Sequence, residues 1–396
     1  MKTSCYLDSN EKESCCGCKV CSAVCPVNAI SFSFDEEGFW YPNIDEEKCI
    51  HCNKCRNVCP LNSENLPTIK EENKTFASYA KSDDVLRKSA SGGIFSVLSD
   101  VILENKGIVF GHIYDENCRA VCSKAETKSE RDKMCGSKYV QSDMKNIYSE
   151  INKATKEKNC VLVSGTPCQI DAIKSYFGKR IPKNLYTMGI ICHGVPSPKI
   201  FDEYIKLQEI KTNKKIEEVV FREKSRGWTL PTRIFCYSDG STQKELLKND
   251  SFNYLFQLNC ILRPSCYKCR YAGRKRIEDI SIGDFWGVQK ENAEMFNDNK
   301  GVSLVLLNTE KGFNLFNSVK DSVVFKRIPF SVAQKRNLPL QHSSNPYCER
   351  SYFYKDYHKK GLSWCLKFYI SKSFIGRAYR KVRREVHKFF KKNSRS

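Results

Sequence analysis

The chain lacks any hydrophobic segment long enough to cross a membrane. None of its 396 residues falls in a run of about 18 apolar residues, the length that a transmembrane helix needs. Its first residues, MKTSCYLDSNEKES, also lack the basic and then apolar layout of a secretory signal. We therefore expect a cytoplasmic protein rather than a secreted or integral membrane protein.

Two common catalytic signatures are also missing. We find no Ser-His-Asp arrangement and no paired carboxylates that would support hydrolysis. No Gly-x-Gly-x-x-Gly follows a predicted strand, which argues against a dinucleotide-binding site of the NAD type. The catalytic chemistry must therefore come from another set of residues.

Cysteine and positive charge are abundant. In a reducing compartment, 22 cysteines favour metal thiolates over disulfides. The chain has 66 basic and 45 acidic residues, and its net charge of +21 suggests an anionic partner. No nucleic-acid-binding motif accompanies this charge, so we expect no specific nucleic acid.

Residues 1–65 contain two copies of one cysteine pattern, C-x2-C-x2-C-x3-C-P. The copies are Cys15, Cys18, Cys21 and Cys25, followed by Cys49, Cys52, Cys55 and Cys59. In two-cluster ferredoxins the fourth cysteine of each run ligates the other cluster. We therefore assign one [4Fe–4S] cluster to Cys15, Cys18, Cys21 and Cys59, and the other to Cys49, Cys52, Cys55 and Cys25. Two zinc sites would fit the C-x2-C pairs but not the third cysteine of each run.

The pattern changes at Thr75, where short apolar runs begin to alternate with helical periodicity. Strands are predicted at residues 107–115, 160–165, 185–192, 219–223, 233–240, 279–287 and 302–308, and helices at 92–105, 167–178 and 198–210. This mixture indicates an α/β core with a partly parallel sheet. We expect an α+β or α/β protein with a ferredoxin-type domain at 1–70, a mixed α/β domain at 71–345 and a basic helical tail at 346–396.

A further C-x2-C pair, Cys266 and Cys269, has no second pair nearby. Cys168 follows one predicted strand and Cys192 ends another, and both are flanked by Gly or Pro, so both could point into one crevice at the strand ends. These four cysteines would complete a site of four thiolates. Alternatively, Cys168 and Cys192 are small buried hydrophobic residues, and their spacing leaves both interpretations open.

Six ordered motifs carry a family resemblance: SASGGIFS, GSKYVQSD, VSGTPCQI, ICHGVPSPKIF, FREKSRGW, and LRPSCYKC with DISIGDFWG. Over residues 5–330 the chain resembles the coenzyme F420 hydrogenase/dehydrogenase beta-subunit family with an N-terminal two-cluster ferredoxin domain. The resemblance implies an oxidoreductase that passes electrons between [4Fe–4S] clusters, FAD and a hydride acceptor, in several members coenzyme F420. It also implies a third [4Fe–4S] cluster on Cys168, Cys192, Cys266 and Cys269. Cys260 falls where the family has an apolar residue.

The resemblance also strengthens a prediction of the FAD site. Gly92 and Gly93, which follow Ser91 and precede an apolar helix, would let backbone amides approach the pyrophosphate. An ordinary helix start is the alternative. Lys138 would pair with a phosphate or with the flavin ring, unless it is a solvated surface lysine. Gly283 and Asp284 end a strand beside the C-x2-C pair and would line the same crevice.

His193 is our one candidate for a catalytic proton donor, because it follows Cys192 directly. It could also donate a hydrogen bond to cluster sulfur, and a buried structural histidine is the alternative.

The C-terminal segment 372–392 has one apolar stripe, with basic residues over most of the remainder. The stripe consists of Phe374, Ala378, Val382, Val386 and Phe390. The segment is either a helix docked on the core or an interfacial helix on anionic lipid, which would make the protein peripheral to the inner face of the membrane.

Three classes of function follow from these observations. The first is an iron–sulfur flavoenzyme that works with a redox partner protein or a soluble hydride carrier. Related bacterial proteins occur beside surface-polysaccharide enzymes, where the acceptor could be a sugar or a lipid-linked intermediate. The second class is a non-catalytic electron-transfer subunit of a partner enzyme. The third is a scaffold in which the clusters are structural.

Overall fold

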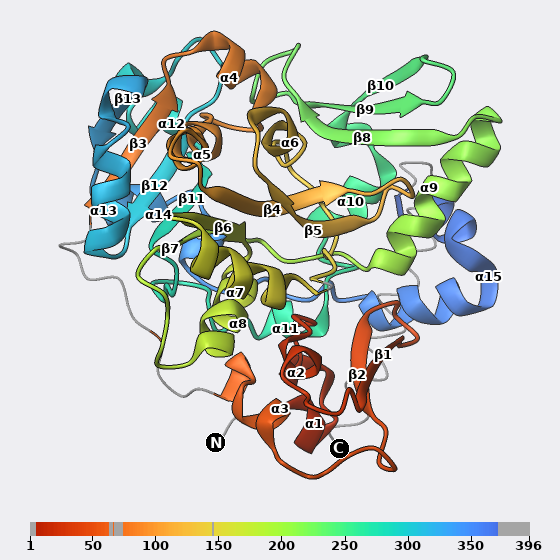
Figure 1. The fold of residues 1–396 in the computed structure, drawn as a ribbon. Coiled ribbons are helices and arrows are strands. Elements are labelled where there is room, and N and C mark those ends of the chain that lie inside the picture. The colour runs from red at the N-terminus through yellow and green to blue at the C-terminus, as the bar shows by residue number, and fades with distance from the viewer. Residues whose placement is uncertain (1–4, 63–65, 67–73, 145, 371–396) are drawn as a thin grey trace, which may run out of the picture.

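A mixed sheet of eight strands forms the centre of the protein (Figure 1). The computed structural model describes residues 5–62, 66, 74–144 and 146–370. The strand order is β13-β3-β12-β11-β7-β6-β4-β5, and the neighbours from β11 through β7 and β6 to β4 are parallel. The strands are β3 (Lys74–Ala80), β4 (Ile108–Tyr114), β5 (Ala120–Ala125), β6 (Val161–Gly165), β7 (Leu185–Ile190), β11 (Ile280–Asp284), β12 (Ser303–Leu307) and β13 (Val323–Arg327).

Helices cover both faces of this sheet because its central strands are apolar on both faces. On β6, Val161 and Val163 face one hydrophobic core, and Leu162 faces the other. Helices α7 (Ile147–Glu157) and α8 (Pro167–Phe177) pack on the first face, and α5 (Ile94–Glu104) and α13 (Glu310–Asn317) pack on the second. Shorter helices are α4 (Asp83–Lys88), α6 (Lys128–Asp132), α12 (Val288–Glu291) and α14 (Phe330–Gln334).

A second, antiparallel sheet lies beside the first and shares a core with three helices. Its strands are β8 (Ile216–Glu223), β9 (Thr232–Tyr237) and β10 (Thr242–Leu246), and the helices are α9 (Pro198–Thr212), α10 (Ser251–Gln257) and α15 (Arg350–Ile370). Helix α15 bends at Gly361, where φ is 77°, and buries Leu362, Cys365 and Tyr369 in this core. The boundary that we predicted at residue 346 therefore does not separate a tail from the core. The apolar stripe of residues 372–392 lies outside the described residues.

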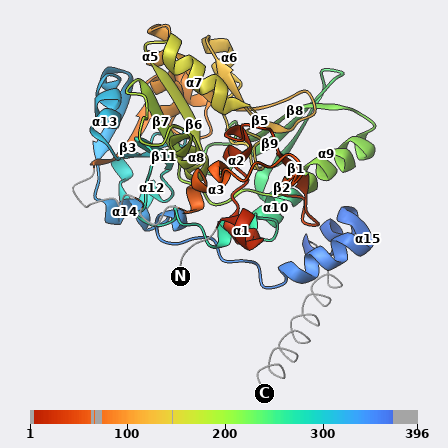
Figure 2. The ribbon, with the colours of Figure 1, turned by 60° about the horizontal axis from the view of Figure 1, so that its bottom comes forward.

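The N-terminal module packs against the helical face that carries α7 and α8 (Figure 2). Its elements are α1 (Tyr6–Ser9), α2 (Val20–Ala23), the hairpin of β1 (Ile30–Phe34) and β2 (Trp40–Ile44), and α3 (Lys54–Asn57). Helix α11 (Pro264–Tyr267) of the main domain also lies against the module. The 3-10 helices are η1 (Lys12–Ser14), η2 (Pro60–Asn62), η3 (Leu247–Asn249), η4 (Ala293–Met295), η5 (Lys320–Ser322) and η6 (Leu338–Leu340).

The ten predicted strands and helices are all confirmed within a few residues, and so is the partly parallel sheet. The fold is a mixed α/β architecture, and a small N-terminal module of iron–sulfur type packs against it. Across the part of the chain that the structure describes, no helix has the length and apolar character to span a membrane.

Candidate metal centres and cofactor site

The first cavity of the N-terminal module collects cysteines from both copies of the repeat. Its lining includes Cys15, Cys18, Cys21 and Cys59, which are the four ligands predicted for one cluster, together with Cys5, Cys16 and Cys55. Burial raises the pKa of Cys21, and the neighbouring Cys15 raises it further. A metal ion supplies the positive charge that stabilises thiolates, so four cysteines gathered around one cavity are suited to a metal centre.

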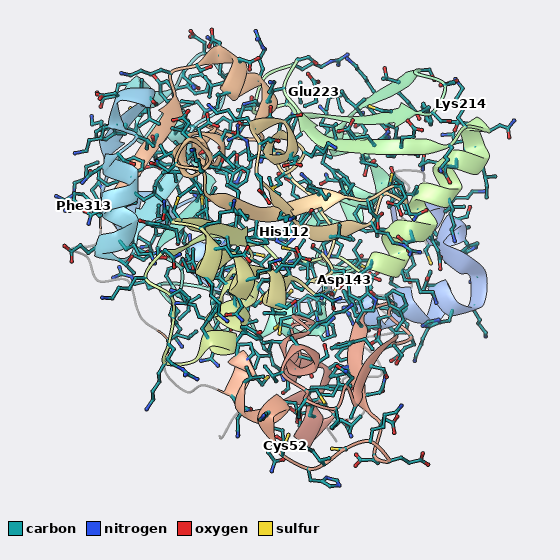
Figure 3. All side chains as sticks on the ribbon, viewed as in Figure 1. Cys52, His112, Asp143, Lys214, Glu223 and Phe313 are labelled. Atoms are coloured by element: carbon teal, nitrogen blue, oxygen red, sulfur yellow. The ribbon has the colours of Figure 1, made fainter. Side chains whose placement is uncertain are left out.

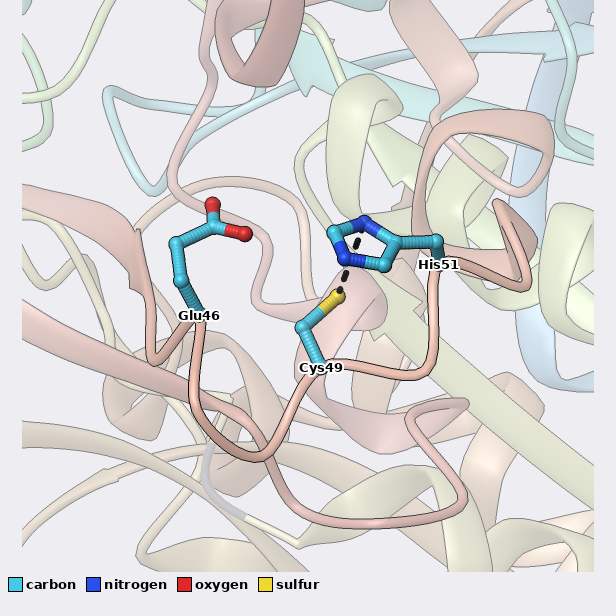
Figure 4. A group of neighbouring side chains, drawn as sticks. All are labelled: Glu46, Cys49 and His51. Atoms are coloured by element: carbon cyan, nitrogen blue, oxygen red, sulfur yellow. Dashed lines mark hydrogen bonds between the residues drawn. The ribbon is translucent and has the colours of Figure 1, made fainter.

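The second cavity is lined by Cys25, Cys49, Cys52 and Cys55, the four ligands predicted for the other cluster. It lies at the outer end of the module, where Cys52 is exposed (Figure 3). Cys49, His51 and Glu46 also cluster here, with 3.9 Å between Cys49 Sγ and His51 Nδ1 (Figure 4). We assign Cys49 to the cavity rather than to a separate site with His51 and Glu46, because it is one of the four ligands predicted for this cluster.

The two halves of the module have the same local geometry. Lys19 precedes α2 with φ 65°, and Asn53 precedes α3 with φ 56°, so each short helix starts from a left-handed residue. Cys21 and Cys55, the third cysteines of the two runs, lie in these helices. The repeated spacing in the sequence therefore produces a repeated structure around each cavity.

The third group of thiols lies at the carboxyl ends of two parallel strands. Cys168 follows β6 at the start of α8, and Cys192 follows β7. Cys266 and Cys269 reach the same place because two loops are tied together. Leu262 pairs with Pro196, and the Arg263 backbone N–H donates to the Val195 carbonyl over 3.0 Å.

Close packing and electrostatics place these four thiols together. A Cβ atom on Gly194, where φ is 141°, would lie 3.3 Å from Cys266 Cβ. Burial raises the pKa of Cys192 well above its usual range, and the nearby Cys266, Cys168 and Cys269 raise it further. The donor set fits an iron–sulfur cluster, since four half-buried thiols from three loops converge at the edge of a parallel sheet. Cys260 lies apart from them in the hydrophobic core.

Cys16 connects the first cavity to the third group of thiols. Its side chain interacts with that of Cys18 on one side and with that of Cys168 on the other. Tyr148 Oη donates to the Cys18 carbonyl over 2.6 Å, and Lys19 forms an ion pair with Asp143, which Figure 3 labels on the main domain. The repeat itself gave Cys16 no role, because it lies between two predicted ligands.

Ser91, Gly92 and Gly93 lie in the loop between α4 and α5, but the contacts of Gly92 are with the sheet. Its N–H donates to Ser303 Oγ over 3.0 Å, and its carbonyl accepts from Ala80. A Cβ atom here would lie 2.5 Å from the Ser78 carbonyl oxygen. Gly92 is therefore needed for close packing on the strands. Gly93, with φ 79°, is the N-cap of α5, which has no side-chain cap.

Gly283 and Asp284 end β11, next to the strand that leads to Cys192. Asp284 is held by two partners from the second sheet region: Arg222 forms an ion pair with it, and Trp228 Nε1 donates to it over 2.8 Å. The exposed Trp286 stacks on Trp228 with ring centroids 5.2 Å apart. Gly283 is packed against the side chain of Ile191.

Lys224 is a cation at this edge that the sequence did not single out. Its Nζ donates to the carbonyls of Ser91 and Lys300 over 2.9 and 2.6 Å. Burial, and then the nearby Arg222, lower the pKa of Lys224 to about 8.

Lys138 and His193 have structural partners. Lys138 Nζ donates to the carbonyls of Lys133 and Cys135 over 3.0 and 2.8 Å, and burial lowers its pKa to about 8. His193 Nε2 lies 2.6 Å from Asn259 Oδ1, and burial lowers the pKa of the imidazole. His112, within β4 (Figure 3), hydrogen-bonds to Ser142 Oγ over 2.7 Å. Burial, and then Lys138, lower the pKa of His112 to about 4.

Comparison with known proteins identifies two regions of the chain. Residues 158–331 match the family described as the C terminus of the beta subunit of coenzyme F420 hydrogenase/dehydrogenase, and residues 14–63 match the 4Fe-4S dicluster domain. These matches confirm the family resemblance. A chain of the F420-reducing [NiFe] hydrogenase complex from Methanosarcina barkeri is a similar solved structure. It is 18% identical, with a TM-score of 0.44, and the match covers 76% of this chain and 93% of that one. The comparison with curated proteins finds no match.

Proposed function

We propose that this chain is an iron–sulfur flavoprotein oxidoreductase, because it joins a 4Fe-4S dicluster domain to the C-terminal domain of coenzyme F420 hydrogenase/dehydrogenase beta subunits. It passes electrons between ferredoxin-type clusters and FAD, and it exchanges hydride with coenzyme F420 or another acceptor.

One observation carries this proposal: the three groups of thiols form a continuous series. The outer cavity reaches the surface at Cys52. Cys55 lines both the outer and the inner cavity, and Cys16 lines the inner cavity and interacts with Cys168 of the third group. The series therefore runs from the surface to the carboxyl edge of the parallel sheet, where ligands bind in open α/β folds. Clusters held there would supply one-electron transfer along the series.

The test is iron content together with selective loss. Anaerobically reconstituted protein should hold about 12 irons, which three four-iron clusters require. Replacing Cys168 or Cys192 by Ser should remove one cluster and leave the ferredoxin signals intact. The matched control is Cys260→Ala, which removes a buried thiol outside all three groups and should retain the full iron content. About 8 irons in the wild-type chain would refute the third cluster.

FAD binding is supported by the positive environment at the same edge. The N-terminus of α5 has no side-chain cap and attracts anions, and the Lys224 ammonium lies against the Ser91 carbonyl. Because the N–H of Gly92 is engaged by Ser303, we assign the pyrophosphate to the first turn of α5 and to Lys224. A bound FAD would convert between single electrons and a hydride.

Turnover of a hydride carrier distinguishes the proposed enzyme from the alternative, a non-catalytic electron-transfer subunit. A chain that acts as an enzyme should turn over a soluble hydride carrier when purified alone, whereas an electron-transfer subunit needs its partner enzyme. Anaerobic assays with reduced coenzyme F420 and other hydride donors separate the two. A sugar or lipid-linked acceptor, as in surface-polysaccharide synthesis, would fit a chain that also binds anionic membrane through residues 372–396.

A further inference from the structure

Arg263 is a fully buried cation that lies between two of the thiol groups. Its guanidinium donates to the Cys15 carbonyl over 2.7 Å, to the Trp40 carbonyl over 2.8 Å and to Gln141 Oε1 over 3.0 Å. It also lies 4.4 Å from the centre of the Tyr41 ring. All of these acceptors are neutral, and within the described residues no carboxylate forms an ion pair with Arg263.

Two carboxylates near Tyr41, whose ring lies against the guanidinium, are engaged elsewhere. Asp35 forms an ion pair with Lys12, and Glu37 forms one with Arg350. Arginine stays ionised in proteins, and an isolated buried charge is costly unless an opposite charge lies close by. The position therefore requires a negative charge that these side chains do not provide.

Two predicted cluster ligands flank the guanidinium. On one side is the Cys15–Cys18 loop, where a Cβ on Gly17 would lie 2.9 Å from Arg263 Nη1. On the other side is Cys266, whose N–H donates to the backbone carbonyl of Arg263 over 2.9 Å and whose thiol interacts with the guanidinium charge. The charge of Arg263 interacts with Cys15, Cys16 and Cys266. Thiolates bound to iron would supply the negative charge on both sides.

We propose that Arg263 is the shared counter-ion of two clusters, the one on Cys15, Cys18, Cys21 and Cys59 and the one on Cys168, Cys192, Cys266 and Cys269, and that it raises the reduction potential of both. This inference rests on the proposed function. Reduction adds one electron to a cluster, so a fixed positive charge stabilises the reduced form. The outer set of Cys25, Cys49, Cys52 and Cys55 is the internal control, because among the described residues the hydrogen bonds of the guanidinium go to Cys15, Trp40 and Gln141 and to none of this set.

The experiment compares three variants of the full-length, reconstituted protein in redox titrations followed by electron paramagnetic resonance. Arg263→Gln removes the charge. Gln141→Glu leaves Arg263 in place but puts a carboxylate at the position of its amide acceptor, 3.0 Å away, which neutralises the guanidinium. Arg263→Lys keeps the charge and loses the fork of hydrogen bonds.

In Arg263→Gln and Gln141→Glu, two of the three titration waves should move to lower potential and the third should stay. We expect at least a tenfold lower ratio of reduced to oxidised cluster at a fixed potential, which is about 59 mV for a one-electron couple. Arg263→Lys should shift the same two waves less. A purely structural role for Arg263 would not produce this pattern in Gln141→Glu.

Wild-type potentials for all three waves in both neutralising variants would overturn the inference, and so would an equal shift of all three waves. If Arg263→Gln fails to hold iron, Gln141→Glu decides the question alone. An iron content of about 8 with one shifted wave would refute the third cluster of the proposed function, while it would still support Arg263 as the counter-ion of the inner ferredoxin cluster.

Discussion

Substitution of Gly17 by Ala tests how tightly the N-terminal module is fixed to the main domain. Gly17 has φ 71°, which costs an L-residue about 1–2 kcal/mol. Its Cβ would also lie 2.1 Å from Gln141 Nε2 and 2.9 Å from Arg263 Nη1. Overpacking of this kind costs about 1–3 kcal/mol, so the total loss should be about 2–5 kcal/mol. That is a large part of the stability of a typical domain, about 5–15 kcal/mol.

The matched control is Gly240→Ala in the turn between β9 and β10. Gly240 has φ 78° but no atom within 4 Å of the added Cβ, so it carries the backbone cost alone. Urea unfolding of the anaerobic protein would be followed by tryptophan fluorescence and by iron–sulfur absorbance. Gly17→Ala should lower the free energy of unfolding by about 1–3 kcal/mol more than Gly240→Ala.

Substitution of Gln141 tests whether its contact with the new Cβ at residue 17 causes the loss of stability. Gln141→Ala removes the atom nearest to the new Cβ, so the double variant Gly17→Ala with Gln141→Ala should lose less stability than the sum of the two single variants. If Gly17→Ala costs no more than Gly240→Ala, or if Gln141→Ala gives no relief, the module is not docked through this contact and our account of the interface is wrong.

Two further predictions concern FAD and the C-terminus. Lys224→Met should weaken FAD binding about tenfold or more, because a hydrogen bond to a charged group contributes about 1.5–3 kcal/mol. By contrast, the Lys224→Arg variant should bind FAD well. Because the pKa of Lys224 is about 8, the ammonium is present below pH 8 and lost above it, so FAD affinity should fall as the pH rises from 7 to 9; a flat profile would contradict the assignment. A chain that ends at Ile370 should keep its clusters and flavin, whereas one that ends at Leu362 loses the buried Cys365 and Tyr369 and should be less stable by about 3 kcal/mol or more. Residues 372–396 hold ten basic side chains and one acidic side chain, so the full chain should bind anionic vesicles at low salt and leave them at high salt; equal binding by the chain that ends at Ile370 would exclude the tail as the cause.

The strongly apolar strands β6 and β12 were predictable, and the polar edge strands β10 and β13 were not. The runs that form β6 and β12 are buried on both faces and stand out in the sequence. By contrast, β10 has the sequence TQKEL and pairs only with β9, and β13 ends in exposed Lys326 and Arg327 at the edge of its sheet. An edge strand is stabilised by pairing on one side and can be polar on much of its surface, so hydrophobic periodicity does not reveal it.

The two cysteine sets of the N-terminal repeat could be predicted because their chemistry is local, whereas the set of Cys168, Cys192, Cys266 and Cys269 followed only from the family resemblance. Each run of the repeat places three thiols on one loop, and the crossing of the fourth follows from the repeat. The cation at the proposed flavin edge could not be predicted in this way. Lys224 reaches Ser91 only because the second sheet packs beside the first, and the two residues lie 133 positions apart in the sequence. Contacts of this kind depend on tertiary packing alone.

Gly92 shows that one sequence signal is compatible with two kinds of close contact. The sequence indicates a glycine where the backbone must approach something closely, and a Cβ there would indeed collide with its surroundings. The neighbours are the carbonyl of Ser78 and the amide of Ser303, so the close approach is between strands. A glycine in the sequence indicates that the space around its backbone is restricted, and only the fold shows whether a strand or a phosphate restricts that space.

The interface between the N-terminal module and the main domain involves the same loops that carry the predicted ligands. Arg263 precedes Cys266 by three residues and donates to the carbonyl of Cys15, and Gln141 Nε2 donates to the carbonyl of Cys16 over 3.3 Å. Docking and ligation therefore depend on one another, since any displacement of the Cys15–Cys18 loop would move both the thiols and the partners of the guanidinium. Metal binding of this kind contributes directly to the stability of the fold. An electron-transfer series needs fixed spacing between its centres, and a shared loop fixes that spacing more firmly than a flexible linker between two independent domains could.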